Sequence, residues 1–528
     1  MDTAHHSHDS TASSQAETQQ PPARQQPGPN RLPARVPSGV PGLDAIMHGG
    51  FLRGGIYIIS GQPGTGKTIL SNQIAFGHVA SGGRALYVNL LSESPSHMFT
   101  HLSSLSFFNH GPVGDALYYV SGYGVMQKEG LIGLGTMLQR LILDHKATLL
   151  IIDGALNAEQ SSNSALEFKA FAYQLQVFGE ATGCTVLLLM STGGGAAGVQ
   201  GEANTLQVAG QTTVDGLIQL GYRRIEMRLV REIEVRKLRG SSHIEGGNAM
   251  QITSDGIEIY PRLEALLAAT VATSQGPPVS NERMAFGLPG LDEMLGGGIP
   301  EGSSTLLLGP SGSGKTLIGL HFLMEGARQG QPGLYFGLSD PLTVIMESAD
   351  RVGMDLRGRI SAGEIEALWH LPVESIVDQM AGRLLEAVRR RGVKRLFIDS
   401  LDSFSRATIF PERTSRFFTA LLNELRFLEV CTVSSLELPE LFSPTVAMPL
   451  QGVSAAAENT IFIRSVELNS KIHRLISILK LQRSGYDPAI REFTISEQGI
   501  TVGNTFAGVE GTLTGLARPL RISETNNG

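Results

Sequence analysis

Apolar runs alternate with helix-length segments along most of this chain. Four short runs lie in its first half and four in its second, at residues 55–60, 85–91, 148–153 and 185–190, and at residues 304–308, 333–338, 394–399 and 432–436. Continuous apolar strands separated by crossovers are typical of a parallel sheet that is covered by helices on both faces. The pattern therefore predicts an α/β fold with mainly parallel sheets.

The two halves of the chain repeat one another. The heptapeptide at residues 38–44 (SGVPGLD) returns at residues 286–292 (FGLPGLD). Asp44 and Lys67 return as Asp292 and Lys315, both at an offset of 248 residues (292 − 44 and 315 − 67). A repeat of this length indicates a duplicated domain rather than a solenoid. We expect a first domain at residues 36–260 and a second at residues 283–508.

Three segments are predicted to lie outside these domains. Residues 1–35 are rich in Gln, Ser, Pro and Ala, and such a stretch cannot bury enough apolar surface to offset the entropy of ordering it. We predict a disordered tail there. Residues 261–282 shift toward Ala, Ser, Gly and Pro, which indicates an interdomain linker, and residues 509–528 are expected to form a C-terminal tail.

Composition narrows the class of protein. Of the 528 residues, 41% are hydrophobic and 17% are charged, with a net charge of −7, which is typical of a soluble protein whose surface is not built for nucleic acid or anionic membrane. We find neither an apolar run of about 18 residues nor a secretory signal, so we expect a cytoplasmic protein without a membrane partner. Cys184 and Cys431 precede matching apolar runs and are expected to be small buried residues in equivalent places.

A glycine-rich motif follows the first apolar run of each domain. It fits G-x-x-x-x-G-K-[ST] and consists of Gly61, Gln62, Pro63, Gly64, Thr65, Gly66, Lys67 and Thr68 in the first domain, and of Gly309, Pro310, Ser311, Gly312, Ser313, Gly314, Lys315 and Thr316 in the second. Between a strand and a helix, such glycines let backbone N–H groups converge on phosphate oxygens. We predict two nucleoside triphosphate sites, in which Lys67 and Lys315 reach the β- and γ-phosphates.

A magnesium site is predicted beside each motif. The third apolar run of each domain ends in aspartate, Asp153 or Asp399, which follow the motif lysines by 86 and 84 residues (153 − 67 and 399 − 315). A carboxylate at a strand end, together with the hydroxyl of Thr68 or Thr316, can hold Mg²⁺ or its waters.

Hydrolysis also needs a group that orients the attacking water or takes its proton. The second apolar run of each domain is followed by one acid, Glu93 or Asp340. In open α/β sheets this strand end faces the ligand, so both acids are candidate catalytic residues. The alternative is an exposed loop charge, or a cap for the helix that follows.

The P-G-L-D phrase, the P-loops and residues 237–243 (KLRGSSH) together resemble the KaiC-like branch of the RecA superfamily, over about residues 36–510. The resemblance implies two tandem RecA-like domains in a homo-oligomeric ring, a hexamer, with ATP and Mg²⁺ bound between neighbouring subunits. It also implies that a K-x-R motif reaches the neighbour's nucleotide. The positions concerned are Lys237, Leu238, Arg239, Ser241 and His243 in the first domain, and Lys480 and Arg483 in the second.

The second domain departs from this pattern. Gln482 stands where the second cation of K-x-R is expected, and Arg483 comes one place late. The family carries paired catalytic glutamates, whereas each domain here keeps one acid. A family phosphoacceptor pair is matched by Ser454 and Ala455, so Ser454 is the one candidate site for serine/threonine autokinase activity.

Three functions are compatible with these features. The first is an ATP-hydrolysing regulatory protein of the KaiC type, a Mg²⁺-dependent ATPase with autokinase activity in its second domain and unidentified regulatory partners. The second is a DNA recombination or repair ATPase of the RadA or RecA type, but residues 191–198 (STGGGAAG), where RecA proteins contact DNA, contain no Lys or Arg. The third is an ATP-dependent scaffold in which only the first domain hydrolyses.

Overall fold

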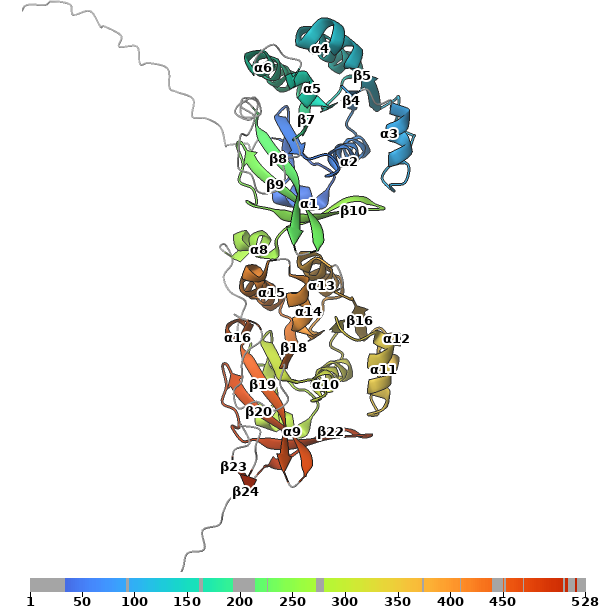
Figure 1. Ribbon diagram of the computed structural model, residues 1–528. Coiled ribbons are helices and arrows are strands. Elements are labelled where there is room, and N and C mark those ends of the chain that lie inside the picture. The colour runs from blue at the N-terminus through green and yellow to red at the C-terminus, as the bar shows by residue number, and fades with distance from the viewer. Residues whose placement is uncertain are drawn as a thin grey trace, which may run out of the picture. The chain divides into compact units, whose positions relative to one another are not determined.

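The structure is a computed structural model that describes residues 34–91, 95–160, 165–192, 214–225, 227–271, 280–372, 375–408, 410–438, 450, 453–468, 470–506, 509–510 and 518–519. Figure 1 shows the helices and strands of the unit that begins at residue 35. Two sheets dominate it, and each belongs to one copy of the sequence repeat.

The first domain contains a sheet of nine described strands with the P-loop strand in its middle. Their spatial order is β11 (Gly256–Tyr260), β10 (Asn248–Thr253), β9 (Arg228–Leu238), β8 (Gly216–Ile225), β3 (Ile56–Gly61), β7 (Thr185–Ser191), β6 (Leu149–Asp153), β4 (Ala85–Asn89) and β5 (Leu117–Ser121). Pairing is parallel from β8 to β5 and antiparallel from β8 to β11.

The second domain repeats this topology. Among its described residues the order is β16 (Ile365–Trp369), β15 (Gly333–Gly337), β17 (Arg395–Asp399), β18 (Cys431–Leu438), β14 (Ser304–Pro310), β19 (Asn459–Leu468), β20 (Lys471–Leu481), β21 (Arg491–Ser496) and β22 (Gly499–Thr505). In both sheets the carboxyl ends of the parallel strands meet at one edge, where nucleotide sites of open α/β sheets lie.

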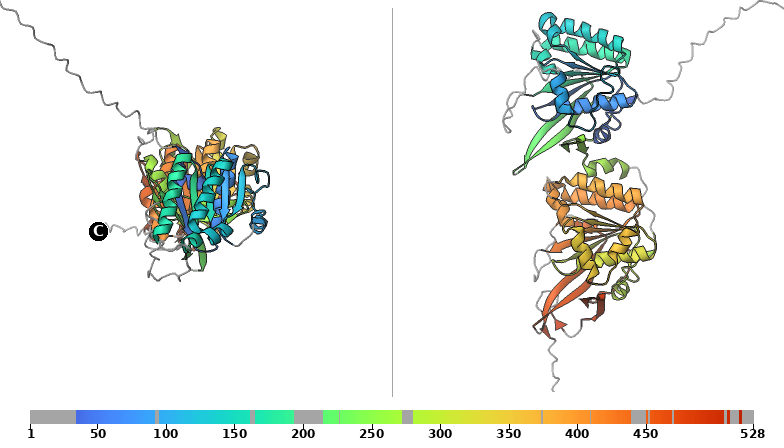
Figure 2. Two further views of the ribbon diagram at one scale, coloured as in Figure 1. Left: turned by 90° about the horizontal axis from the view of Figure 1, so that it is seen from above. Right: turned by 90° about the vertical axis from the view of Figure 1, so that its right-hand side faces the viewer.

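Helices cover both faces of each sheet (Figure 2). The first domain has α1 (Pro41–Ile46), α2 (Lys67–Ala80), α3 (Pro95–Leu102), α4 (Tyr123–His145), α5 (Ala155–Gln160) and α6 (Ala165–Thr182). The second has α9 (Pro289–Met294), α10 (Lys315–Arg328), α11 (Leu342–Asp350), α12 (Leu356–Ser361), α13 (Val377–Arg391), α14 (Leu401–Ala407), the 3₁₀ turn η1 (Pro411–Arg413), α15 (Thr414–Phe427) and α16 (Val453–Ala456). Short strand pairs are β1 (Arg35–Val36) with β2 (Phe51–Leu52), β12 (Arg283–Met284) with β13 (Ile299–Pro300), and β23 (Val509–Glu510) with β24 (Arg518–Pro519).

Each central strand feeds two cores. In β3, Ile56 and Ile58 pack with α4 and α6, whereas Tyr57 and Ile59 pack with α1 and α2 on the opposite face. Successive strand residues point to opposite faces, so a strand between two helix layers must be apolar throughout. This confirms the predicted α/β fold with mainly parallel sheets.

The predicted linker contains a helix, α8 (Leu263–Val271). Its buried Leu263 and Leu267 are spaced four apart and join the core formed with α13 and α15. Arg413 binds Glu264 of α8 through two hydrogen bonds of 2.8 Å each, and it also binds Asp378 at 2.9 and 3.0 Å. The domain boundaries themselves remain predictions.

Both cysteines are buried free thiols, as expected, but they do not occupy equivalent places. Cys431 pairs with Arg395, the first residue of β17, whereas Thr185 pairs with Leu149, the first residue of β6. Cys184 therefore lies one register place earlier than Cys431. Among the described residues, no helix is long and apolar enough to cross a membrane.

Candidate nucleotide sites

Each P-loop leaves the carboxyl end of its central strand and turns into a helix. Gly66, at φ 105°, precedes Lys67, the first residue of α2, and Gly314, at φ 99°, precedes Lys315, the first residue of α10. This left-handed backbone favours glycine, so the last glycine of the motif sets the direction in which the helix starts. The first N–H groups of both helices consequently face the loop, where they can bind phosphate.

The P-loop lysines fold back onto their own loops. Nζ of Lys67 donates to the carbonyl oxygens of Gly61 at 2.8 Å and Gln62 at 3.0 Å. Nζ of Lys315 donates to those of Gly309 at 2.8 Å and Pro310 at 2.7 Å. Burial lowers the pKa of both lysines, and nearby carboxylates oppose this effect. Each ammonium group is therefore held against the first two residues of its P-loop.

The structure brings the predicted magnesium ligands together in both domains. The Thr68 hydroxyl donates to Oδ2 of Asp153 at 3.1 Å, and the Thr316 hydroxyl donates to Oδ2 of Asp399 at 2.8 Å. The members of these pairs lie 85 and 83 residues apart in the chain. The strands that end in aspartate, β6 and β17, pair with β7 and β18, which in turn pair with the P-loop strands β3 and β14. This strand order brings each aspartate into contact with the threonine of its P-loop.

A second hydroxyl group binds each of these carboxylates. Tyr87 donates to Asp153 at 2.7 Å, and Ser435 donates to Asp399 at 2.5 Å. Burial nevertheless raises the pKa of both Asp153 and Asp399 above the ordinary aspartate range. The ionised form of each buried carboxylate thus lacks full compensation from its surroundings.

These donor sets fit Mg²⁺. Carboxylate and hydroxyl oxygens are the hard ligands that this ion prefers, and it completes its shell with water and nucleotide phosphates. Its charge would also offset the burial of Asp153 and Asp399. Thr68 and Asp153 would therefore hold the ion in the first domain, and Thr316 and Asp399 would hold it in the second.

A pocket of about 450 Å³ surrounds the second P-loop. Lys315, Thr316 and Asp399 line its polar part, and Ile345, Val352 and Ile495 contribute apolar walls of the kind that a nucleoside base requires. The space is large enough for part of a nucleotide to enter.

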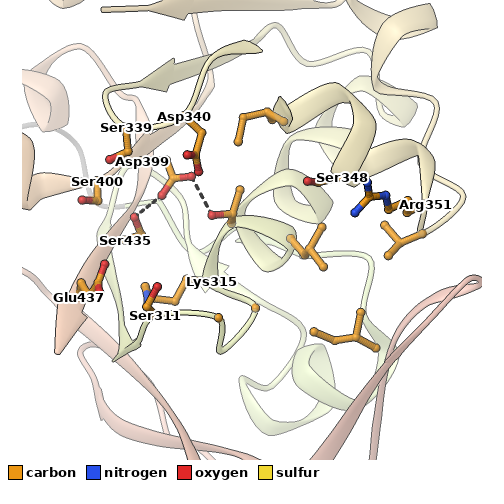
Figure 3. Close-up of a pocket in the computed structure, with 17 residues that line it drawn as sticks. Ser311, Lys315, Ser339, Asp340, Ser348, Arg351, Asp399, Ser400, Ser435 and Glu437 are labelled. Carbon is orange, nitrogen blue, oxygen red and sulfur yellow. Dashed lines mark hydrogen bonds between the residues drawn. The ribbon is translucent and has the colours of Figure 1, made fainter. Parts of the chain in front are cut away.

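Asp340, the predicted catalytic acid of the second domain, also lines this pocket (Figure 3). Its charge contributes to the raised pKa of Asp399, so the two carboxylates lie near one another on the magnesium side of the site. Glu93, the corresponding candidate of the first domain, lies outside the described residues.

Arg239 lies at the opposite end of the first sheet from the P-loop of its own domain. Its backbone N–H donates to the Asp215 carbonyl at 2.7 Å, and Asp215 accepts the N–H of Ile56, the first residue of β3. Five residues separate Ile56 from Gly61 (61 − 56), or about 16 Å of strand. Lys237 lies close enough to Arg239 for the guanidinium to help burial lower the pKa of that lysine. The other predicted residues, Leu238, Ser241 and His243, belong to the same segment.

The corresponding cations of the second domain bind within their own domain, and Arg239 likewise lies 4.0 Å from a carboxylate oxygen of Asp215 in its own domain. Lys480 donates to the Ala457 carbonyl at 2.7 Å, and Arg483 pairs with Glu458. Arg483 adopts φ 65°, close to the φ of 69° at Gly240, so it occupies the place of that glycine while Gln482 occupies the place of Arg239. A non-glycine residue with left-handed backbone angles costs about 1 kcal/mol or more in conformational free energy. The ion pair between Arg483 and Glu458 offsets part of this cost.

Sequence reasoning missed three polar residues at these sites: Tyr87, Ser435 and Glu437. The last two lie on β18, which carries the polar residues Ser434, Ser435 and Glu437 in its second half. Polar residues near the end of an otherwise buried strand were the signal that could have found them.

A glycine-rich phosphate loop on a central parallel strand, with a threonine and a strand-end aspartate joined beside it, defines a P-loop nucleoside triphosphatase domain of the RecA-like class. This chain contains two. A family model described as "ATPase: KaiC" matches residues 36–264 and 284–506, and the chain belongs to that family.

The chain is also similar to relatives named circadian clock oscillator protein KaiC. It is 25% identical over 495 residues to the protein of Rippkaea orientalis, covering 92% of both chains. It is 26% identical over 501 residues to that of Thermostichus vulcanus, covering 93% of this chain and 92% of the relative. For Prochlorococcus marinus the values are 24% over 502 residues, with 93% and 96% covered. The family resemblance seen in the sequence is therefore confirmed.

Proposed function

We propose that both domains bind Mg²⁺–ATP and hydrolyse it, and that the protein works as a cytoplasmic regulatory ATPase whose nucleotide state is read by partner proteins. One observation carries the proposal for two active sites. The P-loop lysine, the threonine and the strand-end aspartate make the same contacts in both domains. This equality favours hydrolysis at both sites over a scaffold in which only the first domain hydrolyses.

The residues of each site have different roles in ATP binding and hydrolysis. Lys67 and Lys315 exchange their loop carbonyls for β- and γ-phosphate oxygens, and the backbone N–H groups of the loop bind the same phosphates. Thr68 with Asp153, and Thr316 with Asp399, orient the ion and its waters. A bound Mg²⁺ would supply positive charge that offsets the negative charge developing on the transferred phosphoryl group. Glu93 is the predicted acid for the attacking water in the first domain, and Asp340, the candidate that the sequence offers in the second, lies near Asp399 on the magnesium side.

Lys67→Ala and Lys315→Ala are expected to silence the two sites separately. Each change removes a charge-assisted contact to phosphate, so ATP affinity at that site should fall by on the order of a hundredfold. Phosphate release and equilibrium binding of radiolabelled ATP measure both effects, with EDTA as the metal-free control and the exposed Lys128→Ala as the matched lysine control. Turnover that survives in the double variant would refute hydrolysis at these P-loops.

We further propose that copies assemble into a ring, a hexamer, in which Arg239 of one subunit completes the first-domain site of its neighbour. The support is the separation of about 16 Å between the level of Arg239 and its own P-loop, which exceeds the reach of an arginine side chain. Lys237 lies beside Arg239 and would act with it. In the second domain, Lys480 and Arg483 are the proposed counterparts, although both bind within their own domain.

A subunit-mixing experiment tests this arrangement. Two variants, Arg239→Ala and Asp153→Asn, both also carrying Asp399→Asn to silence the second domain, are each expected to be inactive at the first site. Mixed equally before ATP is added, they should recover about a quarter of the first-site turnover of the protein that carries Asp399→Asn alone, because one interface in four then joins an intact Asp153 to an intact Arg239. A mixture as inactive as its parts would place Arg239 outside the neighbour's site.

Autokinase activity stays a prediction. Ser454 belongs to α16, but its side chain lies outside the described residues. Label from γ-labelled ATP on the protein, absent in Ser454→Ala, is its test. The loop proposed for the RadA or RecA alternative lies, from residue 193 onward, outside the described residues too.

A further inference from the structure

The carboxyl end of β18 carries an acid that faces the second nucleotide site. Glu437 pairs with Gly309, the first residue of the P-loop, in the parallel register of β18 and β14. Ser435, two residues earlier, points into the site and donates to Asp399. Because strand residues two apart share a face, Glu437 points the same way and lines the pocket.

Glu437 and Asp340 occupy different parts of this pocket (Figure 3). Nζ of Lys315 donates to the carbonyl of Gly309 at 2.8 Å, and Gly309 is the residue beside which Glu437 lies in the strand register. Asp340 instead lies near Asp399, and its negative charge helps to raise the pKa of that carboxyl group. Since the P-loop lysine reaches the γ-phosphate and the strand-end aspartate serves the metal, Glu437 lies on the γ-phosphate side and Asp340 on the magnesium side.

The backbone at Glu437 is fixed by Asp402 of α14, the helix that follows β17. Its N–H donates to Oδ2 of Asp402 at 3.0 Å, and the Ser400 hydroxyl donates to the same oxygen at 3.1 Å. Ser400 directly follows the metal-side Asp399, so the two strand ends are held together. A catalytic carboxylate needs this kind of fixed position, because small displacements of a reacting group cost large factors in rate.

The first domain has no carboxylate at this register position. There Ser191 pairs with Gly61, just as Glu437 pairs with Gly309. At the position of Ser435 the first domain has Leu189, which pairs with Asp153 in the neighbouring strand. The polar face of β18 is therefore particular to the second domain, where the predicted acid is the shorter aspartate, Asp340.

We propose that Glu437 is the general base of the second site, accepting the proton of the water that attacks the γ-phosphate of ATP. This inference rests on the proposed hydrolysis by the second domain. The water oxygen forms a bond to the γ-phosphorus, and its proton passes to the Glu437 carboxylate. The bond from the γ-phosphorus to the bridging oxygen breaks, and its electron pair stays on ADP. Inorganic phosphate leaves, and Glu437 returns the proton to solvent.

The position beside Lys315 suits this role. Direct contact between a carboxylate and the γ-phosphate is repulsive, so the Glu437 carboxylate stays one water molecule away from it. A water between these groups is polarised by the carboxylate and held near the phosphorus that it attacks. The rival role is a charge pair with Lys315 in the nucleotide-free protein, which ATP would have to break.

The test uses the full chain with Lys67→Ala, so that phosphate release reports the second domain alone. Glu437→Gln keeps the shape of the side chain but removes the base, and kcat should fall by about a hundredfold while ATP binding is retained. Glu437→Asp, which withdraws the carboxylate by one methylene, should recover part of that loss. Asp340→Asn should instead raise the Mg²⁺ concentration needed for half-maximal turnover. Ser191→Ala, assayed with Lys315→Ala, is the matched control and should leave first-site turnover within about twofold.

Each outcome decides between the roles. A lower kcat at unchanged ATP affinity supports the base. An unchanged kcat with tighter ATP binding overturns it in favour of the charge pair, and an unchanged kcat and affinity overturns both. If the Lys67→Ala protein binds ATP but releases no phosphate even with Glu437 intact, hydrolysis by the second domain itself is refuted.

Discussion

Asp399→Asn is expected to abolish turnover at the second site and, at the same time, to stabilise the nucleotide-free protein. Loss of the metal-side carboxylate should lower phosphate release there by at least about a hundredfold. The gain in stability follows from burial. Asp399 is 9% exposed, and its surroundings raise the pKa of the carboxyl above the ordinary aspartate range. A neutral amide of the same shape avoids that unfavourable charge.

The pH dependence of the stabilisation has a definite sign. Because the pKa of Asp399 is higher in the folded protein than in the unfolded chain, the folded state binds the proton more readily, and stability falls as pH rises between the two values. Below the ordinary aspartate range, both states are protonated and the carboxyl carries no penalty. The advantage of Asp399→Asn should therefore be largest at neutral pH and disappear toward about pH 4.

The single tryptophan of the chain makes this measurable. Trp369 lies on β16 in the sheet of the second domain, so its fluorescence reports the unfolding of that domain. Melting in EDTA across this pH range, with the exposed Asp144→Asn as control, gives the difference directly. Lower melting of Asp399→Asn at neutral pH would mean that the hydrogen bonds from Ser435 and Thr316 outweigh the cost of burial. Added Mg²⁺–ATP should stabilise the wild-type site by mass action and the variant much less.

The parallel half of each sheet could be predicted from the sequence because its strands are buried on both faces. Such strands form continuous apolar runs, and the observed bounds of β3, β6, β14 and β17 differ from the predicted ones by at most two residues. The antiparallel strands were missed. In β9, buried residues such as Val230 and Ile233 are separated by charged ones, so no apolar run marks the strand.

The candidate sites divide in a similar way. The P-loops could be found because all their residues are adjacent in the chain, and Asp153 and Asp399 because they end apolar strands. Ser435 and Glu437 could not, since their importance depends on the register of β18 beside β14, about 130 residues earlier in the chain. The position of Arg483 could not be assigned from the sequence either. Its backbone angle shows that it takes the place of Gly240 rather than that of Arg239.

Arg395→Met is expected to destabilise the second domain by about 3 kcal/mol. Arg395 is fully buried at the start of β17. Its guanidinium donates to the carbonyls of Ala285 at 2.6 Å and Phe322 at 3.0 Å, and to the side chain of Gln331 at 2.7 Å. The charge also lies 4.6 Å from the centre of the Phe322 ring. Methionine fills a similar volume but leaves these buried oxygens without their donor.

The first domain provides the matched control, because the position that corresponds to Arg395 is filled there by an uncharged side chain. Leu149 takes the place of Arg395 at the start of β6, and His78 takes the place of Gly326, whose added Cβ would lie 2.4 Å from Cδ of Arg395. His78 bonds to Thr148 at 2.7 Å instead. Leu149→Met conserves volume and should cost less than about 1.5 kcal/mol.

Urea unfolding followed through Trp369 fluorescence distinguishes the two changes. Arg395→Met should move the transition to a lower urea concentration at an unchanged slope, whereas Leu149→Met should leave it in place, because the tryptophan lies in the other domain. Since Phe322 belongs to α10, the helix that begins at the P-loop lysine, the loss should also weaken ATP binding at the second site. An unchanged transition would mean that the cost of burying the guanidinium cancels its hydrogen bonds, so that the arginine contributes the geometry of α10 and not the stability of the domain.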